Sequence, residues 1–489
     1  MGSGVIKNII ICFVLVVLAF VVGSMAADGA RESLMLLGGI VGAFVLLYLG
    51  KNCWWLIFVL PPLLSSLPLG ILDSLPVAYL ICIVVLIYWL ILRMMGYVKV
   101  TWNGVVWMDV MTLVLFMYFA YTYYENPVEL MIFSDDDTEY VGGKEYIFAI
   151  AAAICYLVMS IMPCSLNQLN KVLKWALIIQ LVICVVSVLR YRSFMPIGYS
   201  VYKVLACKYS LVGLVIAPWR LILLILALGA SMYGQREVLV RAAFTYIGIS
   251  MVKRQMVLLV MCAAMVVGLL TYLSSQDVLL MLPGRIQRTL YLLPWLKIDE
   301  EIKTKAQHSS DWRKVMWGWA LDPRTRYIRD YVWGDGFGVS MKMLRLNTIL
   351  LNRGAVSVND DQQRFAETGM WHSGVFTAIH RIGFVGLSLM IVWHLTAMFL
   401  IVRVCTVLDK RKQGFYLMFQ TMPFIGNVFV YYISAGTIAN FFSQFHLLAM
   451  AKIAYSEAIK SGIMPPLFSR RQYIPLAIRD IEAEPQISK

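Results

Sequence analysis

Long apolar runs recur along almost the whole chain, and they constrain its fold more than any other feature. Most of them cover about 17–25 residues, enough for one α-helix to cross a hydrocarbon core about 30 Å thick. We expect membrane spans over residues 8–25, 34–50, 53–70, 76–93, 106–123, 146–162, 173–190, 199–218, 220–234, 237–251, 255–273, 382–402, 415–433 and 437–453. Hydrophobic residues make up 60% of the chain and charged residues only 14%, against about 25% charged in soluble domains. The sequence predicts an all-α polytopic membrane protein with about 12–14 transmembrane helices.

The basic residues of the short loops predict the orientation of these spans. With the amino terminus inside, the pair Lys253-Arg254 and the run Lys410-Arg411-Lys412 face the cytoplasm, whereas the acidic loop Glu125–Glu145 faces outward. Both termini are then cytoplasmic. Three regions follow: amino-terminal transmembrane helices over 1–273, one large external loop with short helices over 274–381, and carboxyl-terminal helices with a short cytoplasmic tail over 382–489.

The net charge of +14 does not by itself indicate a nucleic-acid partner. Lys and Arg collect in the short cytoplasmic loops of membrane proteins, and this explains much of the excess. The nine cysteines lie in or beside apolar runs and form no C-x-x-C pair, so we interpret them as small core residues. We expect the lipid bilayer as a partner and no nucleic acid.

The large external loop over 274–381 has an excess of basic residues that the predicted orientation does not explain. Loops longer than roughly 60 residues cross a membrane whatever their charge, so the basic residues there call for a chemical role. Trp312, Met316, Trp319 and Ala320 recur at helical spacing and predict an amphipathic helix at the membrane interface. His308 is predicted to lie in an ordinary loop. Gly334–Gly338 predicts a turn with a close backbone approach.

Arginine and histidine in an external loop fit one kind of chemistry. The outer face of a membrane has no nucleotide sugars, so glycosyl transfer there starts from a lipid-linked sugar whose leaving group is a lipid diphosphate. Arginine offers a planar fork of donors to phosphate oxygens, and histidine is a general base near neutral pH. Two simpler interpretations stay open, an interfacial arginine as a lipid anchor and a histidine as a helix cap.

The acidic triplet Asp135-Asp136-Asp137 also has two interpretations. It is either a solvated part of a negatively charged outer loop or a divalent-metal site. We favour the solvated loop and expect no metal and no cofactor.

Four ordered motifs give the chain a resemblance to a known superfamily. They are Gly234-Gln235-Arg236; then Arg313, Trp317 and Ala320-Leu321; then Gly334-Asp335-Gly336-Phe337-Gly338; and last His372, Phe376 and Gly383. In this order, with many helices and one large external loop, the chain resembles the O-antigen ligases and O-antigen polymerases of bacterial envelopes. It departs from their pattern at Gln235, Ser373 and His380, where the family often has Ser, Asn and Glu.

The resemblance implies a GT-C-like glycosyltransferase of the bacterial inner membrane. It would transfer glycan from an undecaprenyl-diphosphate-linked donor to lipid A core or to a glycan acceptor, with inversion and without a metal. Arg236 and Arg313 would hold the diphosphate, and His372 would activate the acceptor or assist the leaving group. We also expect His380, Arg381 and Trp317 in the substrate site. The alternative is a flippase for lipid-linked oligosaccharide, which should place charged residues within its spans.

Overall fold

The structure of the protein is a computed structural model. It describes residues 42, 44–58, 77–128, 143–162, 164–191, 194–232, 236–291, 293–325, 327–338, 365–366 and 369–467. The expected span 8–25, most of the spans 34–50 and 53–70, and the triplet Asp135–Asp137 lie outside these residues. The chain divides into two compact units, one of residues 1–56 and 84–99 and the other of residues 57–83 and 100–489.

The described residues are helical and contain no β-strand, as the sequence predicts. The bounds of the longer helices are α4 Val77–Met94, α5 Val106–Glu125, α6 Gly143–Ile161, α7 Leu166–Tyr191, α8 Met195–Lys208, α10 Pro218–Met232, α11 Arg236–Val252, α12 Met256–Ser275, α14 Glu300–Leu321, α17 Gly374–Lys410 and α21 Phe445–Lys460. Short helices are η1 Gly50–Trp55, α9 Leu211–Val215, η2 Val278–Met281, α13 Gly284–Leu290, α18 Phe415–Thr421, α19 Pro423–Val430, the π-helical turn η3 Tyr431–Ala435 and α20 Ile438–Phe442.

Four described helices are long and apolar enough to cross a membrane. They are α5, the segment Leu166–Val186 of α7, α12 and α17. Helix α12 has no buried residue in its most apolar stretch, and side chains such as Val257 and Met265 are 78% and 64% exposed. An apolar helix that stays uncovered by protein suits contact with lipid, so these helices suggest a membrane protein.

The smaller unit holds η1 and the carboxyl-terminal part of α4. The Trp54 and Trp55 rings of η1 meet edge to face, with centroids 6.2 Å apart. The Arg93 guanidinium donates to the Val98 carbonyl at 3.2 Å, because a basic side chain in the last turn of a helix pairs with the carbonyls that follow it.

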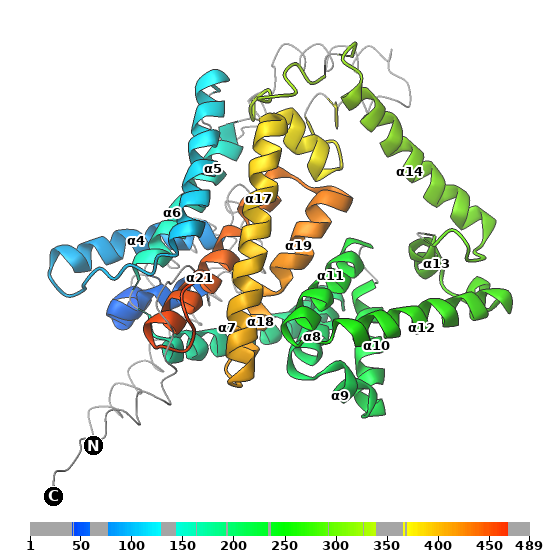
Figure 1. The fold of residues 1–489 in the computed structure, drawn as a ribbon, viewed down its shortest axis with the longest axis horizontal. Helices are drawn as coiled ribbons and strands as arrows, with labels where there is room; N and C mark the ends of the chain where they lie inside the picture. The colour runs from blue at the N-terminus through cyan, green and yellow to red at the C-terminus, as the bar shows by residue number, and fades with distance from the viewer. Residues whose placement is uncertain are drawn as a thin grey trace, which may run out of the picture. The chain divides into compact units, whose positions relative to one another are not determined.

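The larger unit is built around α17. Figure 1 shows α17 at its centre, with α5 on one side and α19 on the other. The Trp393 ring of α17 lies 4.4 Å from the Phe445 ring, and its indole N–H donates to Thr112 Oγ1 at 3.0 Å. Lys452 of α21 is fully buried and donates to Asp109 of α5 at 2.7 Å. Aromatic packing and one buried ion pair thus hold α5, α17 and α21 together.

Three expected spans are divided in the structure: 415–433 into α18, α19 and η3, 437–453 into α20 and α21, and 199–218 into α8 and α9. The span 199–218 is not one helix, because α8 ends at Lys208 and the short α9 starts after Ser210, whose side chain accepts from Gly213 N and caps it. The span 382–402 lies in the segment of α17 that follows a break at Gly383, and α17 also has a first segment that starts at Gly374. Hydropathy did not predict this start, because several residues before position 382 are polar.

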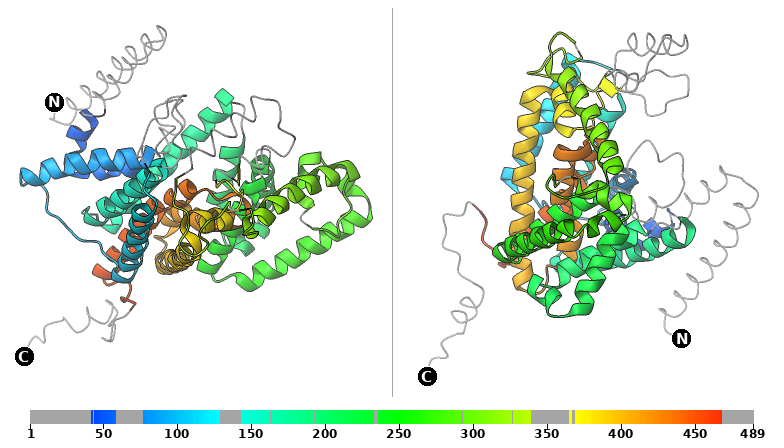
Figure 2. Two further views of the ribbon diagram at one scale, coloured as in Figure 1. Left: turned by 90° about the horizontal axis from the view of Figure 1, so that it is seen from above. Right: turned by 90° about the vertical axis from the view of Figure 1, so that its right-hand side faces the viewer.

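Helices α12 and α14 extend away from the centre of the larger unit. Helix α12 runs outward, α13 turns the chain, and α14 returns to the amino-terminal end of α17, as Figures 1 and 2 show from different directions. The indole N–H of Trp317 in α14 donates to the Trp371 carbonyl at 3.0 Å. This contact anchors the returning helix beside the residues that precede α17.

Candidate functional site

Helix α14 forms where local signals favour a helix. Asp299 is its N-cap, and its carboxylate accepts from Glu301 N at 2.9 Å and Ile302 N at 3.3 Å. Acidic residues in its first turn also suit the helix dipole. The predicted helix is therefore confirmed, with Met316 and Ala320 buried, and its place at the membrane interface stays a prediction. His308 lies within α14, so the expectation that it sits in a loop was wrong; the cap and charge pattern outweigh its polar neighbours.

Arg313 and His372 are brought together although they are far apart in sequence. Arg313 is half-buried on α14 and makes no hydrogen bond or ion pair with any described residue. The His372 ring lies 5.5 Å from the ring of Trp312, the neighbour of Arg313, and 4.7 Å from the Phe365 ring. Arg313 is close enough for its charge to act on the imidazole. Two residues with predicted catalytic roles thus share one environment.

The electrostatics of His372 suit a proton acceptor. Burial of the ring, together with the nearby Arg313 guanidinium, lowers the pKa of His372 below its ordinary value of 6.5. The imidazole is then neutral at neutral pH and has a lone pair available. His372 also has a positive φ of 49°, an uncommon backbone conformation outside glycine that is found where surrounding structure fixes a side chain in place.

Trp317 connects α14 to α17. Besides its hydrogen bond to Trp371, its ring stacks on Phe376 with centroids 5.6 Å apart and an interplanar angle of 24°. Its ring therefore has protein partners on one face. Its predicted contact with substrate stays a prediction.

His380 and Arg381 lie in the first turns of α17 and are 6% and 4% exposed. His380 Nδ1 accepts from Trp371 Nε1 at 3.0 Å, and its Nε2 lies 3.6 Å from a carboxylate oxygen of Asp335. The Arg381 guanidinium donates to the Gly338 carbonyl at 3.0 Å and lies 4.0 Å from Glu145. Both side chains thus face protein groups, and their predicted role in substrate binding stays a prediction.

Arg236 is the first residue of α11. Its side chain lies outside the described part of the structure. The expected convergence of Arg236 with Arg313 and His372 therefore stays a prediction.

The Gly334–Gly338 turn meets α17 at a break in that helix. Gly383 has φ 64° and ψ −176°, so the helical hydrogen bonds across it cannot form. Four backbone groups of α17 that lose their helical partners form hydrogen bonds with the loop instead. The carbonyls of His380 and Arg381 accept from Asp335 N (2.8 Å) and Gly336 N (3.0 Å), and the N–H groups of Phe384 and Val385 donate to Tyr331 O (2.8 Å) and Val332 O (3.2 Å). The loop thus replaces one turn of helix.

Glycine is required on both sides of this junction. A Cβ on Gly334 would lie 2.5 Å from Ile382 N, and one on Gly383 would lie 2.1 Å from Val332 O. Gly334 also has a φ of +86°, a conformation that L side chains rarely adopt. The Gly334–Gly338 turn and Gly383 therefore pack directly against each other, and this contact holds the loop beside His380 and Arg381.

Asp335 is a residue of this region that sequence reasoning treated only as part of a turn. Its carboxylate accepts from Arg329 N at 2.9 Å and from Asp330 N at 3.0 Å, and it faces His380. Burial raises the pKa of Asp335, against the effect of these two hydrogen bonds. An aspartate between two glycines was the available signal, because short acidic side chains often bond to backbone N–H groups in turns.

The structure offers no candidate metal centre within its described residues, since none of them gather as three or more His, Cys, Asp or Glu side chains. No protein-family model matches the chain, and no curated protein matches it either. Its relation to the O-antigen ligase and polymerase superfamily therefore stays a prediction from the four motifs.

Proposed function

We propose that the protein is a polytopic membrane glycosyltransferase of the O-antigen ligase or polymerase type. It transfers glycan from a polyprenyl-diphosphate-linked donor to a lipid or glycan acceptor at the outer face of a bacterial inner membrane. The observation that carries the proposal is the proximity of Arg313, which has no hydrogen bond or ion pair with a described residue, to His372, a histidine of lowered pKa at the start of an apolar helix.

The reaction follows from what these two side chains can do. The acceptor hydroxyl oxygen attacks the anomeric carbon from the side opposite the leaving group, and its proton passes to the neutral His372 imidazole. The bond between the anomeric carbon and the diphosphate oxygen breaks, and the lipid diphosphate leaves with the electron pair. Arg313 stabilises the charge that develops on that oxygen. A single displacement of this kind inverts the anomeric centre.

A transfer assay with the purified full-length protein tests this function. Arg313→Ala and His372→Ala should each abolish transfer from a lipid-diphosphate glycan. Arg324→Ala should not, because Arg324 is an exposed arginine of the same polar segment. Product size separates a ligase, given lipid A core, from a polymerase, given a second lipid-linked repeat. Full transfer by either alanine variant would remove the proposal.

The competing function is translocation of the lipid-linked glycan without chemistry. One observation favours it, a cationic side chain inside the helical core: Lys203 of α8 is 4% exposed and lies 4.0 Å from the Phe419 ring. Movement of labelled donor between leaflets of a proteoliposome, with no new glycosidic bond, would support this alternative.

A further inference from the structure

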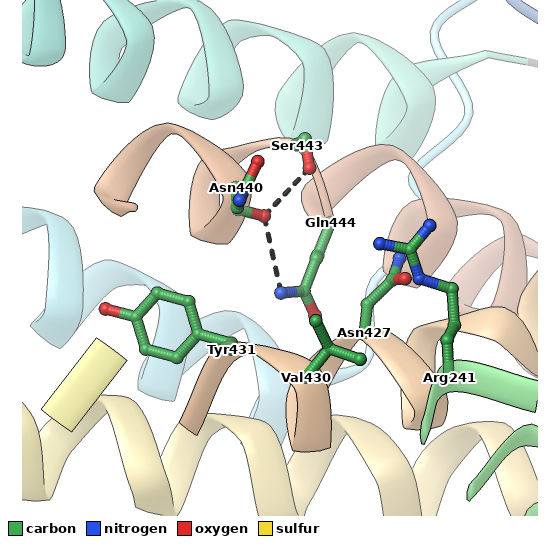
Figure 3. Close-up of a pocket in the computed structure, with 7 residues that line it drawn as sticks. All are labelled: Arg241, Asn427, Val430, Tyr431, Asn440, Ser443 and Gln444. Atoms are coloured by element: carbon green, nitrogen blue, oxygen red, sulfur yellow. Dashed lines mark hydrogen bonds between the residues drawn. The ribbon is translucent and has the colours of Figure 1, made fainter. Parts of the chain in front are cut away.

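The larger unit contains a polar cavity that the site around Arg313 and His372 does not include. Its volume is about 250 Å³, and its lining comes from α11, α19, η3, α20 and the two residues before α21 (Arg241, Asn427, Val430, Tyr431, Asn440, Ser443 and Gln444). Figure 3 shows the Arg241 guanidinium beside the Asn427 amide, with Gln444 and Ser443 facing the same space. Asn440 is exposed, so the cavity opens on the side of that residue.

The lining has more hydrogen-bonding capacity than the protein uses. Arg241 Nε is buried and has no hydrogen-bond partner among the described residues, whereas the Gln444 side chain also lies within hydrogen-bonding reach of the buried His394 imidazole. Arg241 forms no ion pair with any described residue. Within the lining, Ser443 Oγ donates to Asn440 O at 2.8 Å and Gln444 Nε2 donates to the same oxygen at 3.4 Å. A buried guanidinium nitrogen without a partner costs free energy unless a ligand pairs with it.

The composition of the lining specifies the ligand. It has one positive charge and no carboxylate, so it suits a single negative charge. A diphosphate carries more charge than one guanidinium balances in a buried site. Amide and hydroxyl groups donate and accept hydrogen bonds at once, which matches sugar hydroxyls. The volume lies below the range of about 300–1,000 Å³ of pockets for drug-sized ligands, so the ligand is about one sugar ring in size.

We propose that this cavity binds one uronate residue, a monosaccharide with a carboxylate, with the carboxylate on Arg241 and the hydroxyls on Asn427, Ser443 and Gln444. The cavity lies next to the start of α17, because a Cβ on Gly374 would lie 2.2 Å from the Tyr431 carbonyl. The assignment rests on the proposed function in taking this uronate as part of the transferred glycan. Binding of the sugar itself does not depend on catalysis.

Isothermal titration of the full-length protein in detergent with glucuronate, glucose, inorganic phosphate and pyrophosphate tests the site. Glucuronate should bind more tightly than the other three. Arg241→Gln should weaken glucuronate about 10- to 100-fold, the effect of removing a charged hydrogen-bond partner. Gln444→Glu should abolish binding, because it places a second carboxylate beside Arg241. Arg403→Gln is the matched control, since Arg403 bonds to the Pro465 carbonyl away from the cavity.

Three outcomes would overturn the site. They are glucuronate affinity no better than that of glucose, tighter binding of phosphate or pyrophosphate that depends on Arg241, and a large fall in the Tm of unliganded Arg241→Gln. The last would assign Arg241 a structural role, whereas an unpaired guanidinium should be lost without such a fall.

Two further variants separate this site from the proposed function. Arg313→Ala and His372→Ala should lose transfer but keep wild-type affinity for glucuronate. Glucuronate binding without any transfer by the wild-type protein would contradict the enzyme and leave the uronate site standing. Transfer by a protein that does not bind glucuronate would contradict the uronate site alone.

Discussion

At the scale of single residues, the proposed reaction requires a neutral His372 and a charged Arg313. The imidazole acts as a base only while neutral, and the guanidinium carries a permanent charge. Arg313 keeps its charge, and its charge together with the burial of the ring disfavours the imidazolium form of His372. Both side chains are therefore in the required charge state at neutral pH. The same pairing sets the expected pH dependence of the reaction.

The first prediction concerns the acidic limb of the pH profile of kcat/KM. Because the pKa of His372 is lowered below 6.5, activity should persist as the pH falls through 6.5 and decline only below it. The folded state also resists protonation of this residue more than the unfolded state does, so its contribution to stability is lost below pH 6.5. A limb centred at or above pH 6.5 would contradict the assignment of His372 as the base.

The second prediction concerns the shape of the cation. Arg313→Lys keeps the charge but loses the planar fork, and we expect kcat to fall about 10²- to 10³-fold, as when one donor to a developing oxyanion is removed. Arg324→Lys, at an exposed position, should leave kcat unchanged. Equal activity of the two variants would show that Arg313 acts as a point charge or not at all.

At the scale of elements, the broken helix α17 joins the loop to the apolar core. Its two segments are held by the backbone of residues 331–336 rather than by helical hydrogen bonds. The Tyr118 hydroxyl on α5 adds a hydrogen bond to the Ile382 carbonyl at 2.7 Å. The loop and the residues before the break therefore depend on one another for stable structure.

The third prediction tests this junction. Gly383→Ala should destabilise the protein by roughly 1–3 kcal/mol or more, since a non-glycine residue at positive φ is strained and its Cβ would collide with Val332. Gly268→Ala in α12, where a Cβ meets nothing within 4 Å, should be neutral or slightly stabilising. Thermal unfolding in detergent measures both. Equal Tm values would mean that the junction is not rigid.

At the scale of the whole molecule, buried charges within apolar surroundings decide which helices pack together. Lys452 on α21 is fully buried, and its Asp109 partner on α5 also accepts from the Tyr156 hydroxyl at 2.7 Å. Three helices thus meet at one carboxylate. The flippase alternative expected charges within spans, and this pair has a structural explanation that needs no substrate.

The fourth prediction follows from that pair. Asp109→Asn should cost about 3–5 kcal/mol, because Lys452 would be left buried and without a counter-charge. Glu457→Gln removes the partner of Lys460, whose side chain is 46% exposed, and should cost less than about 1 kcal/mol. Asp109→Asn combined with Lys452→Met should recover much of the loss. No recovery in the double variant would point to another role for Asp109.

Hydropathy and local spacing determined much of the fold. The bounds of α5 and α12 agree with the expected spans 106–123 and 255–273 to within two residues at each end, because twenty or so apolar residues in a row satisfy both helix formation and burial in lipid. The amphipathic α14 followed from spacing alone. The order of the four motifs also identified residues 313, 334–338, 372 and 383 as candidate site residues from the sequence alone.

Tertiary structure decided what these segments do to one another. The first segment of α17, from Gly374 to the break at Gly383, was not predicted, because hydrogen bonds from the loop satisfy the polar backbone at that break. Arg241 gave no local signal beyond one charge in an apolar run, and only the approach of α19 and the turns after it surrounds that charge with amides. Sequence records the apolar content and hydrogen-bonding groups of each segment, whereas the partner of each buried polar group depends on which segments meet in the folded chain.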